Sequence, residues 1–592
     1  MAVTPSSPPF APSVRTVLVF AWLVILGGKL ATIGAFGTDL PYWDQWAKEG
    51  EHILMPWFRG QSFLTGLVSA HNEHRIVPTL LLNLGLVVGG GQWDARVQCI
   101  ASAGVHATVL VGLVGWAWRR VGRHWGLAAL GLAALIGALP IAWDNVLGGF
   151  QSQYYFLAGA SLLAMERLLS APVARLGWWV GLGFGLVALI CMGSGLLVAV
   201  PVLGIVLLRA VRREPRGRDH VVTFLAAALV LGVGLWLHAA APWHATLRAK
   251  GVADFMLYVV RSMAWPVPGV MAFALLVWGP WVVLAVRRIL GHRAPGDDVL
   301  IAAGLWVLLQ FAAVAYSRAG GSTHPAARYG DISSLGLLLG FLSLASVTTA
   351  WPATRRRVTS WVTGGCAVVA LVAAVIPVWN GDLPVRKGQY WAFEDAVRRF
   401  VADDNFADFE KRPLPFPLAD WLARILRDPG IRAAMPASAG VSLAGESQVT
   451  VARAGDGAAE PRVWASQPVR PGAPYWRMEF AGAFDPRTAH LTVRDEAGVV
   501  LRSVPWPAAG AGPRAEIMLA APSVSSRLEL RLEGPADEVT LVLPRAVSRL
   551  SWAGWRLASW GWTILGIAAA GAFISAVQVV RRGSEHVTEA NR

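Results

Sequence analysis

Charged residues are scarce in this chain: they make up 15% of its 592 residues, whereas hydrophobic residues make up 55%. A soluble globular protein of ordinary composition carries about 25% charged residues. Apolar runs of about 20 residues, each long enough to cross the hydrocarbon core of a bilayer, recur along the chain. This composition argues against an ordinary soluble domain and predicts a polytopic α-helical membrane protein.

Cysteine is also scarce, and its spacing is not that of a metal site. The chain has three cysteines, Cys99, Cys191 and Cys366, and all of them lie in apolar runs. None occurs between residues 381 and 550, so disulfides do not stabilise that polar region. We assign no metal-ligating residue and no certain cofactor from the sequence.

Glycine-rich nucleotide loops and nucleophile elbows are absent, which argues against chemistry driven directly by ATP. The net charge of +15 comes largely from Lys and Arg in short segments between apolar runs. Such a distribution is typical of loops that orient a membrane protein and contact anionic lipid. We therefore expect anionic membrane lipids, and no nucleic acid, as partners.

The apolar runs predict about 12 membrane spans. They lie at residues 15–37, 97–118, 125–143, 154–170, 177–191, 195–210, 221–240, 266–286, 298–316, 331–351, 358–378 and 556–580. Arginine clusters near 120, 212, 288, 356 and 581 then share one side, which the positive-inside rule assigns to the cytoplasm. We expect a multi-pass protein of the bacterial inner membrane, with both termini cytoplasmic and residues 381–550 periplasmic.

Residues 76–93 are apolar enough to cross as well, but a crossing there would put every later arginine cluster on the wrong side. Either this segment is re-entrant or interfacial, or one of the other spans is miscounted. We favour the first interpretation. A segment of this kind must be buried in protein or line a cavity.

The sequence divides into five regions. Residues 1–14 are expected to form a disordered cytoplasmic tail, and 15–380 a multi-span domain with an outer loop at 38–75. Helical apolar spacing in 381–436 predicts a helical outer segment. Short alternating strands and turn residues in 437–550 predict a β-sandwich-like domain, and 551–592 complete the chain with a final span and a cytoplasmic tail.

The first outer loop holds the strongest candidates for catalysis. Asp44 lies between Trp43 and Trp46, and Asp39 precedes it. Apolar rings near a carboxyl tend to raise its pKa, which suits a general base. The loop ends in a cluster that could bind a phosphate, a cation or a sugar, or could simply be a hydrated helix start: His71, Glu73, His74 and Arg75.

Two later loops add candidate binding residues. Asp144, Asn145 and Gln151 form a polar set suited to sugar hydroxyls. Arg318 and Arg328, with Tyr329, lie on the outer side against the positive-inside bias, so they call for a ligand such as a phosphate held by a bidentate fork. The alternative for Arg328 is a structural pair with Asp331.

A first span, an acidic outer loop and a His/Arg cluster before the next apolar segment together resemble the GT-C superfamily of integral-membrane glycosyltransferases. The resemblance implies a polyprenyl-phosphate-linked sugar as donor and Asp44, with Asp39 second, as the base or acceptor-positioning carboxylate. It maps a further acid onto Asp144. Because Asp44 is followed by Gln45 where the family commonly has an Asp-Glu pair, a divalent cation stays an open question.

The leading expectation is transfer of a sugar from a polyprenyl-phosphate donor to a glycan, lipid or protein acceptor on the outer face of the membrane. The alternatives are a lipid-linked glycan transporter or flippase, a polymerase or ligase, and a non-catalytic protein of envelope assembly. A transporter predicts charges buried between the spans.

Overall fold

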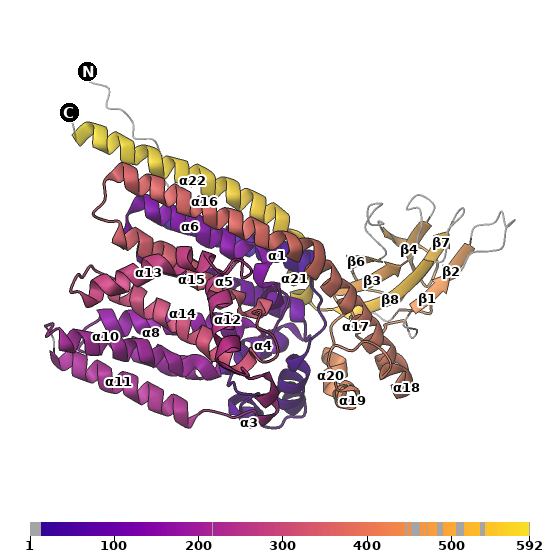
Figure 1. The fold of residues 1–592 in the computed structure, drawn as a ribbon. Helices are drawn as coiled ribbons and strands as arrows, with labels where there is room; N and C mark the ends of the chain where they lie inside the picture. Colours follow the sequence, from indigo (N-terminus) through magenta and orange to yellow (C-terminus); the bar gives the residue numbers. More distant parts are fainter. Residues whose placement is uncertain are drawn as a thin grey trace, which may run out of the picture.

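The computed structural model describes residues 14–590, apart from 216, 445, 447, 452–461, 470–471, 482–488, 505–513 and 533–538. A helical bundle is followed by a smaller C-terminal unit of short helices and strands, and a last long helix returns along the bundle (Figure 1). We call the end of the bundle that carries the strands the β end.

The helices and helical turns before residue 383 form the bundle and its loops. They are α1 (Val14–Phe36), η1 (Gln45–Leu54), α2 (Met55–Phe58), α3 (Leu64–Val68), α4 (Val77–Gly90), α5 (Ala95–Val121), α6 (Arg123–Ala138), η2 (Pro140–Ala142), α7 (Trp143–Val146), α8 (Ser152–Ser170), α9 (Leu176–Leu189), η3 (Gly193–Val198), α10 (Ala199–Val211), α11 (Gly217–Trp236), η4 (Pro242–Leu247), α12 (Val252–Met263), α13 (Phe273–Ile289), α14 (Asp297–Arg318), η5 (Ala327–Tyr329), α15 (Gly330–Val347), α16 (Ala353–Pro377) and η6 (Val378–Asp382).

Within the described residues, nine helical stretches are long and apolar enough to cross a membrane. They contain α1, α5, α6, α10, α11, α14, α15, α16 and α22 (Gly561–Ala590). This is the make-up of a multi-pass membrane protein. The expected spans at 154–170, 177–191 and 266–286 correspond to α8, α9 and α13, which are not among the nine. At about 1.5 Å per residue, α9 is shorter than a bilayer core of roughly 30 Å, so the count of about 12 spans stays a prediction.

The first and last membrane helices pack along each other (Figure 1). Glycine permits this approach, because a Cβ added to Gly27 would lie 2.6 Å from the backbone nitrogen of Leu565 in α22. One added to Gly34 would lie 2.6 Å from the carbonyl oxygen of Ala558 in α21 (Arg549–Ser559), the helix that leads into α22. Lipid tails are as apolar as the helix surfaces, so the hydrophobic effect does not drive helices together in a bilayer. Helices associate there through close packing, which small residues such as glycine permit.

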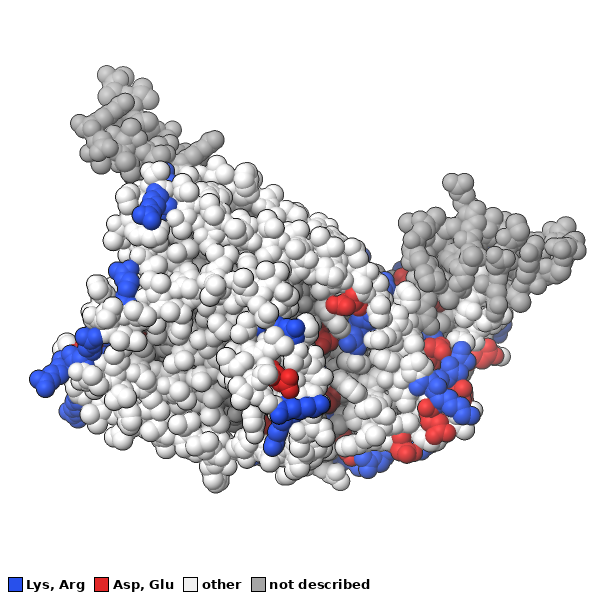
Figure 2. Space-filling view, viewed as in Figure 1, with Lys and Arg blue, Asp and Glu red and all other residues white. Residues whose placement is uncertain are grey.

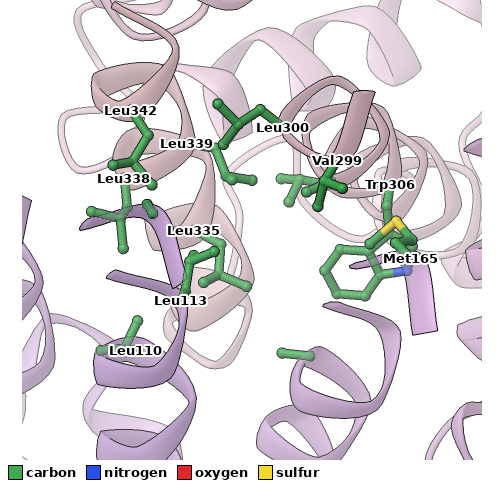
Figure 3. Close-up of a cluster of buried hydrophobic side chains, with 14 of the residues drawn as sticks. Leu110, Leu113, Met165, Val299, Leu300, Trp306, Leu335, Leu338, Leu339 and Leu342 are labelled. Atoms are coloured by element: carbon green, nitrogen blue, oxygen red, sulfur yellow. The ribbon is translucent and has the colours of Figure 1, made fainter. Parts of the chain in front are cut away.

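The bundle core lies between α5, α8, α14 and α15 (Figure 3). Its buried side chains interdigitate from all four helices and include Leu110, Leu113, Met165, Val299, Leu300, Trp306, Leu335, Leu338, Leu339 and Leu342. Lys and Arg gather at the end of the bundle away from the strands, and charges of both signs lie near the C-terminal unit (Figure 2). The surface between these zones is almost free of charge, as expected for a lipid-facing surface.

Helix α4 begins and ends at the β end of the bundle. The Val77 N–H donates to the Ile190 carbonyl next to η3, and the Trp93 N–H donates to the Ala434 carbonyl of the C-terminal unit. Helix α5 then starts where the Ala95 N–H donates to the Asp39 carbonyl in the first loop. Whether this segment is re-entrant or interfacial stays a prediction.

The C-terminal unit begins with helices and continues as strands. Its elements are α17 (Leu383–Asp403), α18 (Phe406–Phe409), α19 (Ala419–Leu426), α20 (Pro429–Ala434), β1 (Gln448–Val451), β2 (Arg462–Ala465), β3 (Tyr475–Ala481), β4 (Ala489–Asp495), β5 (Val500–Val504), β6 (Arg514–Ala520), β7 (Ser526–Leu532) and β8 (Val539–Val547), and α21 (Arg549–Ser559) leads into α22. Two four-stranded antiparallel sheets, in the orders β1-β8-β3-β6 and β2-β7-β4-β5, enclose one apolar core. Alternating side chains such as Trp476, Met478 and Phe480 point into it.

Arg477 of β3 joins the C-terminal unit to the first loop. Its guanidinium is buried and donates to Asp39 Oδ2 at 2.7 Å and to Glu516 Oε1 at 2.9 Å. Glu479 Oε1 lies 3.0 Å away, and Glu394 of α17 lies 3.9 Å away. Four elements far apart in sequence therefore share one buried cation.

We predict that Arg477→Leu destabilises the protein by about 3–5 kcal/mol, because it leaves several buried carboxylates without their cation. Thermal unfolding of the purified protein in detergent measures this. Arg494→Gln is the matched control in the same unit. Its pair with Glu529 at 3.0 Å is partly exposed, and its loss should cost less than about 1 kcal/mol. Equal stability of the two variants would contradict the role given to Arg477.

Candidate active site

The first loop presents Asp44 through a strained turn. Trp43 has a φ of 55°, in the left-handed region that non-glycine residues rarely adopt. Its N–H donates to the Pro415 carbonyl at 2.8 Å, so the C-terminal unit holds the turn. Asp44 then occupies the N-cap position of η1, a π-helix that begins at Gln45, and its side chain makes no capping hydrogen bond. Strain of this kind is common at functional sites, where the surrounding structure sustains it.

A buried polar network holds η1 against α4 and α5. Glu49 accepts hydrogen bonds from Asn83 Nδ2 at 2.5 Å and from Trp93 Nε1 and Gln98 Nε2, each at 3.0 Å. Gln98 Oε1 in turn accepts from Gln45 Nε2 at 2.6 Å. Burial raises the pKa of the Glu49 carboxyl to about 7, although these donors oppose the rise. The network positions the residue that follows Asp44.

Asp44 lies beside His71, with 3.3 Å between Asp44 Oδ2 and His71 Nε2. Burial alone would raise the pKa of the Asp44 carboxyl, but the hydrogen bond to His71 and the charges of Arg328 and His244 bring it below its ordinary value. The expectation that nearby indole rings raise this pKa is therefore wrong. The structure provides an ionised carboxylate.

A polar cavity of about 340 Å³ opens beside Asp44. It gathers residues from loops that are far apart in the sequence, and eight of the predicted site residues line it. These are Asp44, Glu73, His74, Asp144, Gln151, Arg318, Arg328 and Tyr329. The bundle thus brings the three predicted polar loops to one place.

Glu73 anchors one wall of this cavity. Its Oε1 lies 2.6 Å from His244 Nδ1 and 3.6 Å from Arg318 Nη2. The same Arg318 nitrogen lies 3.3 Å from His244 Nδ1. Burial would raise the pKa of Glu73, but the hydrogen bond with His244 and the charge of Arg318 lower it. Sequence reasoning missed His244, which lies in a loop that otherwise gives no signal beyond the adjacent Trp243.

Arg386 of α17 reaches into the cavity from the C-terminal unit. Its Nη1 donates to the Tyr42 hydroxyl at 2.7 Å, and its Nη2 lies 3.5 Å from Asp144 Oδ1. The guanidinium also lies over the rings of Tyr42, Trp143 and Tyr390 at 4.9, 4.8 and 5.7 Å. Sequence reasoning missed this residue too. A basic pair at 386–387 on the expected outer side breaks the charge bias in the same way as Arg318, and this signal could have found it.

Arg328 has no carboxylate within 4 Å among the residues that the structure describes, and its guanidinium lies over the Tyr329 ring at 5.4 Å. The alternative pairing with Asp331 is not formed. Instead Asn145 Nδ2 donates to the Arg328 carbonyl at 2.7 Å and to Asp331 Oδ2 at 2.8 Å. The Tyr155 hydroxyl donates to the same carboxylate oxygen at 2.9 Å. The turn that carries Arg328 is therefore fixed, and its charge stays available to a ligand.

A second, mainly apolar cavity of about 320 Å³ adjoins the polar one. Both cavities are lined by Glu73, His74, Tyr154, His244, Arg318 and Tyr329. Beyond these shared residues, side chains such as Leu157, Met192 and Phe311 make the second cavity apolar. The paired space suits a ligand with a polar head and a hydrocarbon tail.

Four predicted residues lie outside the cavity lining. Asp39 is buried against Arg477, whose charge, with that of Arg96, holds the pKa of Asp39 below its usual range although burial alone would raise it. We therefore assign Asp39 to the contact by which Arg477 joins the C-terminal unit to the first loop, and no longer to catalysis. Arg75 donates to the Leu237 carbonyl, Asn145 supports the Arg328 turn, and His71 acts through Asp44.

In the part of the chain that the structure describes, no group of three or more His, Cys, Asp or Glu side chains is arranged to hold a metal ion. These residues therefore offer no ligand set for a divalent cation, and the need for one stays an open question. No protein-family model matches the chain, and no curated protein matches it either.

His74 makes a pH-dependent contribution to stability. It is half-buried, and its Nδ1 accepts from the Gly193 N–H at 3.1 Å. Burial lowers the pKa of His74 from 6.5 to about 4, although Glu73 opposes this. Between these values the unfolded chain binds a proton that the folded chain excludes, so stability must fall as the pH drops from 6.5 toward 4.

We predict that His74→Asn weakens this loss of stability at low pH, because an amide oxygen can accept the same hydrogen bond without titrating. Melting temperatures of wild type and variant, measured in detergent at pH 7 and pH 5, provide the comparison. If the two proteins lose the same stability on acidification, His74 is not the group responsible.

Proposed function

We propose that this protein is a membrane glycosyltransferase of the GT-C type that moves a sugar from a polyprenyl-phosphate donor to an envelope glycan, lipid or protein acceptor. One observation carries the proposal. The ionised carboxylate of Asp44 and the available guanidinium of Arg328 line the same polar cavity, and this cavity adjoins an apolar one.

In this proposal Asp44 acts as the general base. Its carboxylate takes the proton from an acceptor hydroxyl as that oxygen attacks the anomeric carbon of the donor sugar, and His71 orients the carboxylate from 3.3 Å away. The bond between the anomeric carbon and the phosphate oxygen breaks, and the electron pair leaves with the polyprenyl phosphate. Attack opposite the leaving group inverts the anomeric centre.

Arg328 and Arg318 stabilise the negative charge that develops on the leaving phosphate. Such electrostatic stabilisation is often the largest single contribution to catalysis. Arg318 is already paired with Glu73, so Arg328 is the stronger phosphate ligand. The polar set Asp144, Gln151 and Arg386 lines the remaining wall and can bind sugar hydroxyls.

The apolar cavity is assigned to the first isoprene units of the donor. Its lining by α8 and α14 residues such as Leu157 and Phe311 puts hydrocarbon beside the phosphate position. Because the arginine-rich ends of α5 and α13 lie away from the strands, we propose that the β end faces the periplasm and that both termini are cytoplasmic.

A lipid-linked glycan transporter is the second candidate, and a buried charge cluster favours it. Lys29 of α1, His106 of α5 and Asp331 of α15 are all buried within spans, and His106 Nε2 lies 3.8 Å from Asp331 Oδ1. Ionisable residues within membrane helices often mark a transport path. Here the cluster also supports the Arg328 turn through Asn145, which accounts for Asp331 without transport.

Asp44→Asn should lower the transfer rate by about 10²–10⁴-fold, because an amide cannot accept the acceptor's proton. The protein should still reach normal levels, since the side chain keeps its size. Analysis of lipid-linked sugars in cells carrying this variant, beside wild type and a deletion strain, should show the same accumulated donor in the variant and the deletion.

Asp420→Asn is the control for the Asp44 experiment, because Asp420 is an exposed carboxylate of α19 outside the cavity. It should behave as wild type. A deletion phenotype that Asp44→Asn does not reproduce would contradict the transferase proposal and favour the transporter or a non-catalytic role.

Arg328→Met should lower the turnover number by about 10²–10³-fold, because it removes the charge that meets the leaving phosphate. Arg328→Lys should recover part of this loss, since a lysine keeps the charge but not the planar fork. Turnover measured with purified protein and a polyprenyl-phosphate sugar tests the ranking. An Arg328→Met enzyme with unchanged turnover would place the phosphate elsewhere.

A further inference from the structure

A third cavity, of about 280 Å³, adjoins α17 beside the catalytic cavity. Its walls come from the end of α1, the start of α5, helices α17 and α21, and strands β3 and β6. Tyr390 lines both this cavity and the catalytic one. The groups assigned to catalysis above, Asp44, His71, Arg318 and Arg328, do not line this cavity. We call it the junction cavity.

The junction cavity opens where two membrane helices end. Gly34 is near the end of α1, and Ser559 is the last residue of α21, just before α22 begins. Both line the cavity and are exposed. The close approach of Gly34 to Ala558 puts these two helix ends side by side. This level corresponds to the headgroup region of a bilayer, where indole rings such as Trp391 and Trp555 of the lining are favoured.

The lining carries charges of both signs. Glu394, Glu479 and Glu516 supply carboxylates, and Arg96 and Lys387 supply cations. Arg96 is only 5% exposed and its Nε has no hydrogen-bond partner, while its Nη2 lies 3.9 Å from Glu516 Oε1. Among the described residues Lys387 has no carboxylate within 4 Å, and its ammonium lies over the Trp391 ring at 5.1 Å. Two cations are therefore available for an anionic group inside the cavity.

We propose that the junction cavity binds the headgroup of an ethanolamine phospholipid from the surrounding bilayer. Arg96 and Lys387 hold the phosphate, and the carboxylates of Glu516 and Glu394 accept hydrogen bonds from the ammonium group. The acyl chains leave past the exposed residues Gly34 and Ser559, where the cavity opens. A headgroup with a phosphate and a three-proton ammonium matches a lining that offers cations and hydrogen-bond acceptors together.

Other membrane headgroups fit this lining less well. A choline headgroup has no N–H to donate to Glu516 or Glu394, and a glycerol headgroup carries no cation to balance them. A neutral sugar has no negative charge to pair with Arg96 and Lys387. The same chemistry therefore predicts a ranked preference among lipids that differ only in the headgroup.

The bound lipid would connect the bilayer to the catalytic cavity. The headgroup contacts α17 at Lys387 and Glu394, and the same helix presents Arg386 and Tyr390 to the catalytic cavity. It also touches β6 through Glu516, next to the Arg477 junction. The site is independent of the reaction proposed above, and its test needs no enzymatic readout.

The full-length protein, purified in detergent and stripped of lipid, would be titrated with dioleoyl phosphatidylethanolamine, phosphatidylcholine or phosphatidylglycerol, and bound lipid counted by native mass spectrometry. The expected result is one phosphatidylethanolamine retained about tenfold more tightly than either of the others, as the loss of one charged hydrogen-bonded contact implies. Equal retention of the three lipids, or preference for phosphatidylglycerol, would overturn the proposal.

Two variants locate the bound lipid. Glu516→Gln should abolish the preference for phosphatidylethanolamine, because Glu516 meets the ammonium group that distinguishes this lipid. Lys387→Met should weaken the retention of all three lipids, because Lys387 meets the phosphate that they share. Lys387 forms no ion pair among the described residues, so this variant remains informative if loss of the Glu516–Arg477 contact impairs folding. Lys411→Met, at an exposed lysine of the same unit, is the matched control and should retain the preference. Undiminished retention of phosphatidylethanolamine in Lys387→Met would place the lipid elsewhere and refute the site.

Discussion

The buried charge of Arg477 is the constraint on which the arrangement of this protein depends. A guanidinium removed from water must be surrounded by acceptors, and here they come from the first loop, α17, β3 and β6. The ion pairs of the Arg477 guanidinium with these acceptors fix the C-terminal unit against the end of α1. Because α17 is part of that unit, the same contacts determine where Arg386 enters the polar cavity beside Asp44.

Within the polar cavity beside Asp44, some charged groups are paired with one another and others are available to a ligand. Arg318 is paired with Glu73, and Arg386 with Asp144, whereas Arg328 has its backbone held by Asn145 and its charge left for a ligand. This arrangement gives the cavity a fixed cation close to an ionised carboxylate. The apolar cavity beside it gives a paired space, one part polar and one part apolar.

Much of the site was accessible to sequence reasoning because polar residues in an apolar chain are conspicuous. Asp44, Arg318 and Arg328 stood out as charges in short loops, and the structure brings them to one cavity. His244 and Arg386 did not stand out, because their roles come from neighbours in distant segments. Asp39 looked equivalent to Asp44 in sequence, but it faces β3 and is used by the junction.

The sequence by itself determined that the chain is a helical membrane protein with a C-terminal β region, because hydropathy and residue alternation are local properties. Only the tertiary structure decided which loops meet. The direction of the Asp44 pKa shift, the separation of Asp39 from the cavity and the freedom of Arg328 all depend on charges contributed by remote helices. Electrostatic interactions act across space, so their outcome follows from packing and not from order along the chain.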